Sequence, residues 1–277
     1  MERVKKYGTL HYPRTRHAYN GQAVGIMYIS DGSIENPDAQ EIDVPIRIGD
    51  ITPDHMMRVP GDVGNATSFP FPVQYKYVTG VTMSEVLRPV PTDRAIQVVQ
   101  KACQEFEREG VQCICTGCGF FAYFQPYMNQ VVDIPVFSSA LLQVPMASIA
   151  IAPRKVAIMT ANAATLTERH LLNCGITDAY PYVVWGMERY TEPHNTMWLT
   201  EVDMEKRTQE LERRLSAAAL DCIAAHPDVG AFVLECTNMP PASHAIQQAT
   251  GMPVFDIITL VQYAHSFVIK RRFSGYM

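Results

Sequence analysis

The chain has 277 residues, of which 47% are hydrophobic and 18% charged, and its formal net charge at pH 7 is −5. This composition is typical of a globular protein with a sizeable core, built as one large domain or two small ones. A net negative charge without a long basic run argues against nucleic-acid binding. The most apolar stretch, 138–153, is interrupted by polar residues and proline and is too short to span a membrane, so we expect neither a nucleic-acid nor a membrane partner.

Seven cysteines are spread along the chain, and the polar first residues do not resemble a secretory signal. An odd number of dispersed cysteines favours reduced thiols, and hence a cytoplasmic protein. Cys103 and Cys222 lie on apolar faces of expected helices, and Cys174 precedes Gly175 at an expected helix end. We interpret these three cysteines as structural.

The first half of the chain begins with an apolar run at 23–30, which predicts a buried strand. Segment 31–72 is rich in proline, aspartate and glycine, as loops are. It is longer than a strand-to-helix connection needs, and we interpret it as a lid or a dimer contact. The alternating segment 73–82 predicts a half-exposed strand.

A helix is predicted over 93–109, because Ile96, Val99 and Phe106 recur at helical spacing. Thr92 or Asp93 can cap its start, and Gly110 stands at its expected end. Residues 111–116 then predict a strand that leads to "TGCGF".

The second half repeats this plan: a strand and turn at 152–163, a helix at 203–226 and a strand at 230–235. Cys118 and Cys236, which are 118 residues apart, follow the last strand of each half. The sequence therefore predicts an α/β fold of two pseudo-symmetric parallel-sheet lobes with the active site in the cleft between them. The expected division is an N-terminal arm at 1–22, a first lobe at 23–141 plus 255–277, and a second lobe at 142–254.

Both cysteines fall where parallel sheets bind ligands, beyond the carboxyl ends of their strands. Gly117 and Gly119 would let the backbone approach a ligand closely. Since a helix is expected to begin after each cysteine, its N–H groups should lower the thiol pKa and favour thiolate. Backbone amides at 117–119 and 237–239 are the expected donors to a developing negative charge on the substrate.

Other chemistries fit less well. Cys113, Cys115 and Cys118 form a C-x-C-x-x-C run, but the first two should face away from the third, and no second zinc knuckle follows. The chain contains no G-x-S-x-G elbow and no nucleotide-binding glycine motif. We therefore expect neither a metal nor a cofactor.

The segments "TGCGF" (116–120), "MTANAATLT" (159–167) and "ECTNMP" (235–240) resemble the aspartate/glutamate racemase superfamily. This superfamily includes amino-acid and hydantoin racemases, maleate isomerases and arylmalonate decarboxylases. The resemblance implies a homodimer without a cofactor, in which Cys118 and Cys236 are the two bases acting on a small carboxylate. The glycine after Cys118 departs from the Asn-Thr of amino-acid racemases, which weakens an assignment of aspartate or glutamate as substrate.

The expected activity is therefore that of a racemase or epimerase, an isomerase that moves a proton at the carbon α to a carboxylate. The alternatives are a lyase such as a decarboxylase, a cis–trans isomerase, or a ligand-binding protein without turnover. Asp62 and Asn65 could equally form an Asx turn with no ligand, and Asp62 is a candidate to orient or deprotonate Cys118. The expected substrate-binding residues are Asp62, Asn65, Gly117, Gly119, Thr160, Asn162, Thr237 and Asn238.

Overall fold

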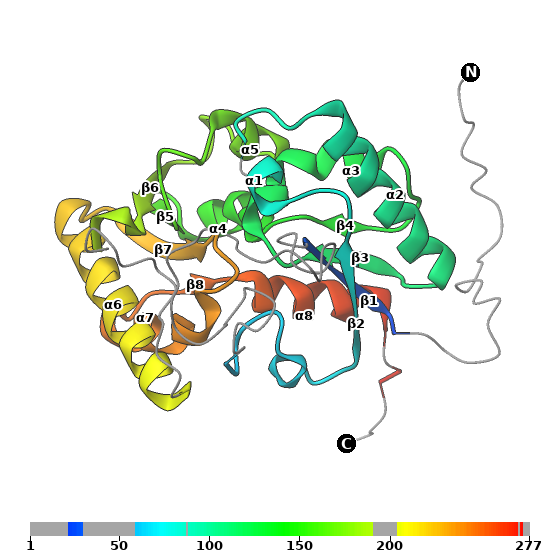
Figure 1. Cartoon of the computed structure of the whole chain (residues 1–277). Helices are drawn as coiled ribbons and strands as arrows, with labels where there is room; N and C mark the ends of the chain where they lie inside the picture. Colours follow the sequence, from blue (N-terminus) through cyan, green and yellow to red (C-terminus); the bar gives the residue numbers. More distant parts are fainter. Residues whose placement is uncertain (1–21, 30–58, 87, 191–203, 271, 274–277) are drawn as a thin grey trace, which may run out of the picture.

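The computed structural model describes residues 22–29, 59–86, 88–190, 204–270 and 272–273 (Figure 1). The expected N-terminal arm, apart from residue 22, and the first part of the 31–72 segment lie outside these ranges. A role of that segment as a lid or dimer contact therefore stays a prediction.

Four parallel strands form the sheet of the first lobe: β1 (Val24–Ile29), β2 (Val73–Val78), β3 (Cys113–Thr116) and β4 (Val136–Phe137). Their order across the sheet is β2-β1-β3-β4. All residues of β1 and β3 are buried, as expected for inner strands covered on both faces.

The second lobe has the same topology, with β5 (Lys155–Thr160), β6 (Tyr182–Gly186), β7 (Val229–Leu234) and β8 (Val254–Phe255) in the order β6-β5-β7-β8. Each strand again runs parallel to its neighbours. The predicted fold of two pseudo-symmetric parallel-sheet lobes is confirmed.

The repeat extends to single hydrogen bonds. Ile114 donates its N–H to the carbonyl of Pro135 at 3.0 Å, and Phe232 donates to Pro253 at 2.9 Å. Each residue of the second pair lies 118 positions after its counterpart, the same interval that separates Cys118 from Cys236. The strand pairs β3–β4 and β7–β8 therefore have matching registers.

The long helix of each lobe agrees with the pattern of its sequence. The first, α2 (Asp93–Glu109), is capped by Thr92, whose hydroxyl accepts the N–H of Ala95, and is followed by Gly110 in the left-handed region. The other helices are α1 (Met83–Val86), α3 (Gln125–Asn129), α4 (Val144–Ile151), α5 (Glu168–Asn173), α6 (Met204–Ala225), α7 (Ser243–Thr250) and α8 (Ile257–Val268). Short 3-10 helices are η2 (Ala66–Ser68), η3 (Gly119–Phe124), η4 (Ala140–Gln143), η5 (Met187–Tyr190) and η6 (Pro240–Ala242).

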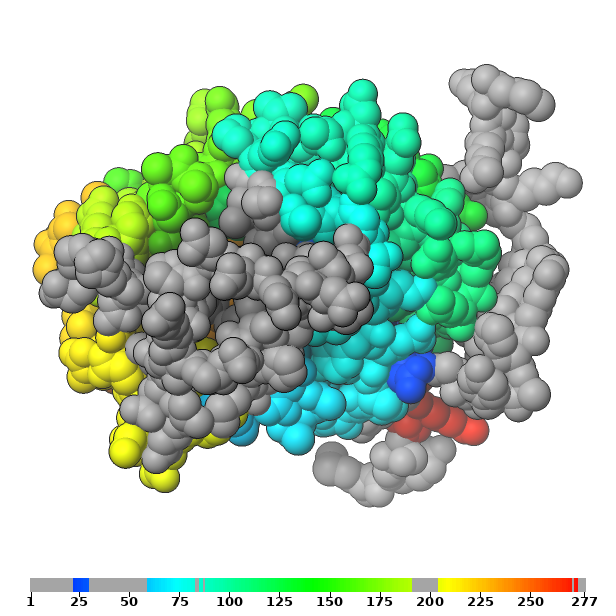
Figure 2. Space-filling view, viewed as in Figure 1, coloured from blue at the N-terminus to red at the C-terminus, as the bar shows by residue number. Residues whose placement is uncertain are grey.

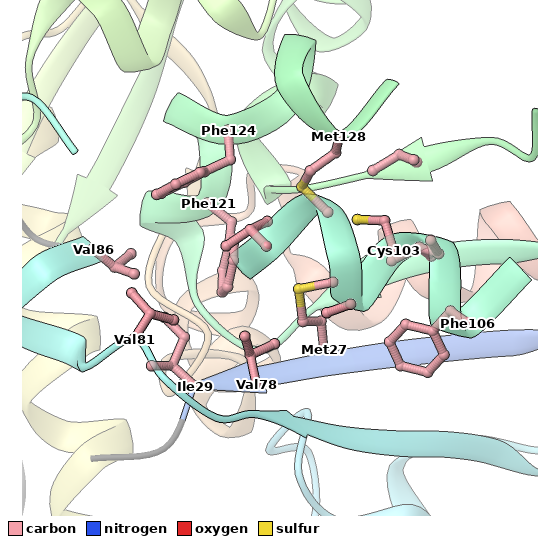
Figure 3. Close-up of a cluster of buried hydrophobic side chains, with 14 of the residues drawn as sticks. Met27, Ile29, Val78, Val81, Val86, Cys103, Phe106, Phe121, Phe124 and Met128 are labelled. Atoms are coloured by element: carbon pink, nitrogen blue, oxygen red, sulfur yellow. The ribbon is translucent and has the colours of Figure 1, made fainter. Parts of the chain in front are cut away.

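Both faces of the inner strands β1 and β3 are buried. On one face Met27 packs in a cluster with Cys103 and Phe106 of α2 (Figure 3). On the other face Ile26 packs with Ile257 of α8, so the last helix of the chain returns to the first sheet (Figure 1).

Helix α6 covers the second sheet, where Leu215 packs with Phe232. The space-filling view shows α6 at the opposite end of the molecule from α2 (Figure 2). Cys103, Cys174 and Cys222 are all buried, as predicted for structural cysteines. None of the helices in the described ranges has the length and hydropathy needed to cross a membrane.

Candidate active site

The residue before each cysteine leaves its strand in the same way in both lobes. Gly117 donates its N–H to the carbonyl of Met27, and Glu235 donates to the carbonyl of Met159, both at 2.8 Å. Met27 and Met159 belong to β1 and β5, the strands next to β3 and β7. The two cysteines therefore stand at equivalent carboxyl ends of their sheets.

The turns that follow the cysteines also match. Phe121 donates its N–H to the carbonyl of Cys118 at 3.2 Å, and Met239 donates to the carbonyl of Cys236 at 3.1 Å. Each turn leads into a 3-10 helix, and both cysteines are partly exposed while the other five are buried. The turns expected after the two cysteines are confirmed, although their first helical residues form 3-10 rather than α-helix.

The two cysteine loops contact each other directly, so the lobes meet at this point. The hydroxyl of Thr237 donates to the carbonyl of Gly117 at 2.7 Å. On the other side, the Cα of Gly119 packs against the carboxyl group of Glu235. The residue after each cysteine thus contacts the residue before the other, which is the pattern of a twofold axis passing between Cys118 and Cys236.

The glycines on both sides of Cys118 are explained by this packing. A Cβ at position 119 would overlap the carboxyl and carbonyl oxygens of Glu235, and a Cβ at position 117 would lie 2.6 Å from the ring of Tyr28. The backbone at these two glycines therefore approaches Glu235 and Tyr28 closely, whereas the sequence predicted a close approach to a ligand.

Glu235 is the main residue that the sequence analysis missed. Its side chain is fully buried, and its Oε2 accepts the hydroxyl hydrogen of Thr160 at 2.8 Å. Its Oε1 accepts no hydrogen bond from any described residue. Burial raises the pKa of this carboxyl group to about 7, although the Thr160 hydroxyl opposes the shift. Thr160, one of the expected binding residues, thus contacts Glu235 directly.

The predicted lowering of the thiol pKa values is wrong. Burial, and then the charge of Glu235, raise the pKa of Cys118 to about 12, although the N–H groups of Phe120 and Phe121 favour the thiolate. The pKa of Cys236 also lies well above its usual value, mainly through burial and Glu235, with smaller contributions from Cys118 and Asp62. Desolvation outweighs the helix N-terminus because a 3-10 turn supplies few donors.

Asp62 lies in the loop that follows the segment outside the described ranges. Its side chain is buried, and its Oδ1 accepts the N–H of Gly64 at 2.7 Å. The neighbouring Gly61 packs against the backbone of Pro241 in the second lobe. The charge of Asp62 raises the pKa of Cys236, and its expected role at Cys118 stays a prediction.

The three expected asparagines differ in their surroundings. Asn65 caps η2 by accepting the N–H of Thr67 at 2.9 Å, as in the Asx-turn alternative. Asn162 accepts the N–H of Ala164 at 2.9 Å in a similar turn after β5. Asn238 instead lies at the second thiol, where its Nδ2 is 3.9 Å from the sulfur of Cys236.

Two of the amides expected to stabilise a substrate are already bonded within the protein. The N–H of Gly117 belongs to the sheet hydrogen bond with β1, and that of Met239 closes the turn at Cys236. Cys113 and Cys115 are buried in the cluster under α8, apart from Cys118. Within the described ranges, no three His, Cys, Asp or Glu side chains are grouped in a way that could bind a metal ion.

Comparison with solved structures identifies the fold. The chain is similar to an arylmalonate decarboxylase variant (TM-score 0.54, 14% identity, 88% of this chain and 92% of that one). It is also similar to an aspartate racemase homologue from Pyrococcus horikoshii (TM-score 0.52, 14% identity, 90% and 99%). An allantoin racemase from Pseudomonas fluorescens gives a TM-score of 0.52 at 14% identity, over 88% and 90%. The fold is that of the aspartate/glutamate racemase superfamily, as the motifs indicated.

No protein-family model matches the chain, but curated relatives do. A dimethylsulfoniopropionate lyase of Durusdinium sp. clade D is 34% identical over 228 residues, which cover 79% of this chain and 74% of that protein. Dimethylsulfoniopropionate lyases 3 and 6 of Emiliania huxleyi are 33% and 34% identical over 72% of this chain, which spans about half (53%) of their length. The chain belongs to the dimethylsulfoniopropionate lyase family.

This relationship corrects the functional prediction. The expected racemase or epimerase, and with it the isomerase class, is wrong, because the curated relatives are lyases. The fold was predicted correctly, and the lyase alternative agrees better with the relatives. The motifs did not separate these activities, because structures of both racemases and a decarboxylase are similar to this fold.

Proposed function

We propose that the protein is a lyase that cleaves dimethylsulfoniopropionate, or a closely related sulfonium carboxylate, to dimethyl sulfide and acrylate. The single observation that supports this most is a pair of partly exposed thiols at matched strand ends in a chain that is 34% identical to a dimethylsulfoniopropionate lyase. The substrate has a C–H bond next to its carboxylate and a sulfonium leaving group on the next carbon.

The proposed reaction is a β-elimination. A thiolate at Cys118 or Cys236 takes the proton from the carbon α to the carboxylate and becomes a thiol. The electron pair of that C–H bond forms the carbon–carbon double bond of acrylate. The bond from the β-carbon to the sulfonium sulfur breaks, and its electron pair leaves with neutral dimethyl sulfide. Release of the captured proton to solvent restores the thiolate.

One base is sufficient for this chemistry. A racemase needs an acid opposite its base to return a proton, whereas a sulfonium leaves as a neutral thioether without protonation. The second thiol is then available to orient the substrate. Two contacts support an orienting role for the second cysteine loop. Asn238 contacts the sulfur of Cys236, and Thr237 donates to the Gly117 carbonyl.

The carboxylates near the thiols suit a cationic substrate. Asp62 and Glu235 both raise the pKa of Cys236 through their charge, so negative charge near this thiol favours a cationic ligand beside it. A cytoplasmic location also belongs to this proposal, supported by seven cysteines of which none is joined in a disulfide.

The experiment is direct detection of both products. Purified protein is incubated with dimethylsulfoniopropionate, and dimethyl sulfide in the headspace and acrylate in solution are measured together. Equal amounts of the two support the elimination. The neutral thioether 3-(methylthio)propionate serves as the control, because it has the same carboxylate but a poor leaving group and should yield no acrylate. Absence of both products from the sulfonium substrate would contradict the proposal.

A further inference from the structure

Three tyrosines lie side by side near the carboxyl end of the first sheet. Tyr28 of β1 pairs in register with Tyr77 of β2, and Tyr75 lies two residues before Tyr77 on the same strand. The centroid of the Tyr28 ring is 6.0 Å from that of Tyr75 and 5.8 Å from that of Tyr77. The ring planes are inclined at 55° and 43°, so the rings are tilted against one another and not stacked. We call these three residues the tyrosine cluster.

The tyrosine cluster contacts the loop of the first cysteine. A Cβ added to Gly117 would lie 2.6 Å from the Tyr28 ring, so this ring packs directly on the Gly117 backbone. Gly117 precedes Cys118, and its carbonyl oxygen accepts the Thr237 hydroxyl that links the two cysteine loops. The cluster therefore lies next to the point where the two lobes meet.

The cluster also contacts the loop that contains Asp62. Tyr75 donates its hydroxyl hydrogen to the carbonyl of Val63 at 3.0 Å, and Val63 directly follows Asp62. Gly61, which precedes Asp62, packs against the backbone of Pro241 in the second lobe. The Asp62 loop is thus held between the tyrosines and the second lobe, so aromatic rings and an acidic side chain come together at the junction of the lobes.

The tyrosine cluster is open to solvent at one end, because Tyr77 is 42% exposed whereas Tyr28 is only 8% exposed. The face of an aromatic ring has a partial negative charge and attracts a cation that lies within about 6 Å of the ring centroid. A trialkylsulfonium group has no N–H or O–H to donate, so hydrogen-bond acceptors cannot hold it. Aromatic faces and a nearby negative charge are the protein groups that can recognise such a cation.

We propose that the tyrosine cluster is the binding site for the sulfonium group of the substrate, which it recognises by cation–π attraction together with the charge of Asp62. This inference deepens the proposed lyase function and rests on it. In dimethylsulfoniopropionate the sulfonium sulfur is bonded to the β-carbon. A sulfonium held at the cluster therefore leaves the α-carbon and the carboxylate on the side of the cysteine loops, which the Tyr28 ring adjoins at Gly117.

The proposed site has a kinetic consequence. Cation–π attraction acts on the positively charged substrate and weakens as the carbon–sulfur bond breaks, because dimethyl sulfide is neutral. The interaction is therefore stronger in the bound substrate than in the transition state. Loss of a ring should raise KM more than it lowers kcat.

The test compares two acids that have the same shape and differ in charge. The first, 3-(trimethylammonio)propionate, has a quaternary ammonium group, and the second, 4,4-dimethylpentanoate, has carbon in place of the nitrogen. Isothermal titration calorimetry measures both dissociation constants and requires no turnover. In the wild type we expect the cation to bind more tightly than its neutral isostere. Tyr28→Leu and Tyr77→Leu should each lower this preference by between about twofold and about thirtyfold.

Two kinds of control separate the aromatic face from other properties of these side chains. Tyr28→Phe and Tyr77→Phe keep the rings and should keep the preference for the cation. Tyr263→Leu removes a tyrosine that is 56% exposed on α8 and that packs against Phe267, outside the cluster. This variant should have the wild-type preference.

An unchanged preference in either folded leucine variant would overturn the inference, as would a wild-type protein that does not prefer the cation. Circular dichroism establishes that each variant is folded, and Tyr77→Leu decides the question if Tyr28→Leu does not fold. The outcomes also separate the two proposals. Release of dimethyl sulfide with an unchanged preference would contradict this inference alone, whereas a lowered preference without any release of dimethyl sulfide by the wild type would contradict the lyase function alone.

Discussion

Thr237 donates its hydroxyl hydrogen to the carbonyl oxygen of Gly117 across 2.7 Å, and so ties the loop of one cysteine to the loop of the other. The two residues are 120 positions apart in the sequence, and Thr237 is buried. The contact holds the loop of Cys236 at a fixed position relative to the loop of Cys118. A reaction that uses groups from both loops depends on that position to within a fraction of an ångström.

Thr237→Val should remove this tie while keeping the shape of the side chain. We expect a fall in kcat/KM of about 10²-fold, since small displacements of reacting groups have effects of that size. The unmatched carbonyl should lower the free energy of unfolding by about 1–3 kcal/mol. Thr237→Ser keeps the hydroxyl and is the matched control. Equal activity of the valine and serine variants in a dimethyl sulfide assay would contradict the assigned role.

Gly119→Ala should disrupt the contact between the lobes. The added methyl group would overlap the carboxyl and carbonyl oxygens of Glu235, and backbone must move to accept it. We expect a loss of about 3 kcal/mol in the free energy of unfolding, measured by urea denaturation. Gly175→Ala is the control, because no atom lies within 4 Å of its added Cβ and only its positive φ of 78° opposes the change. Gly175→Ala should lower the free energy of unfolding by roughly 1 kcal/mol. A loss no larger than this in Gly119→Ala would contradict the close packing of Gly119 against Glu235.

The buried carboxyl group of Glu235 should make the protein less stable as pH rises. Its pKa is about 7 in the folded state against an ordinary value of 4.5, so the folded protein binds the extra proton between these values. The contribution is present below about pH 4.5 and is lost as pH rises through 7, a change of about 3 kcal/mol. Glu235→Gln should therefore gain stability relative to the wild type by that amount between about pH 4.5 and 8. Parallel curves from urea denaturation would contradict burial of the ionisable group.

His170 should have the opposite effect. Burial lowers its pKa to about 4 from 6.5, so the unfolded chain binds the extra proton. Its contribution is present above about pH 6.5 and is lost as pH falls through 4, again about 3 kcal/mol. The opposing slopes of Glu235 and His170 should nearly cancel in the wild type between about pH 4.5 and 6.5. Urea denaturation of Glu235→Gln should reveal a rising stability over this interval, and a flat curve would contradict the assignment to His170.

The sequence predicted the regular parts of the fold because their signals are local. Helix α2 has its cap at Thr92 and its stop at Gly110, and the buried strands β1 and β7 are continuous apolar runs. Short elements such as α5 and the two-residue strand β4 were not predicted, since they are too brief to show a period. Their positions depend on tertiary packing.

The cysteines of the candidate site followed from the repeated pattern, whereas their chemistry did not. Glu235 was visible as an acidic residue that ends an apolar strand, at the position that Gly117 occupies in the first half. Its burial, its bond to Thr160 and its effect on both thiols require the second lobe to be placed against the first. A rule based on local helix ends therefore could not predict the direction of the thiol pKa shift.

The central claim is that a thiol from each lobe acts on one sulfonium carboxylate, and release of dimethyl sulfide by single variants tests it most directly. Cys118→Ser and Cys236→Ser should each lower kcat/KM for dimethylsulfoniopropionate by about 10²–10⁴-fold. Cys222→Ala, which changes a buried cysteine of α6, should retain the wild-type value. A wild-type rate of dimethyl sulfide release in either serine variant would contradict the account.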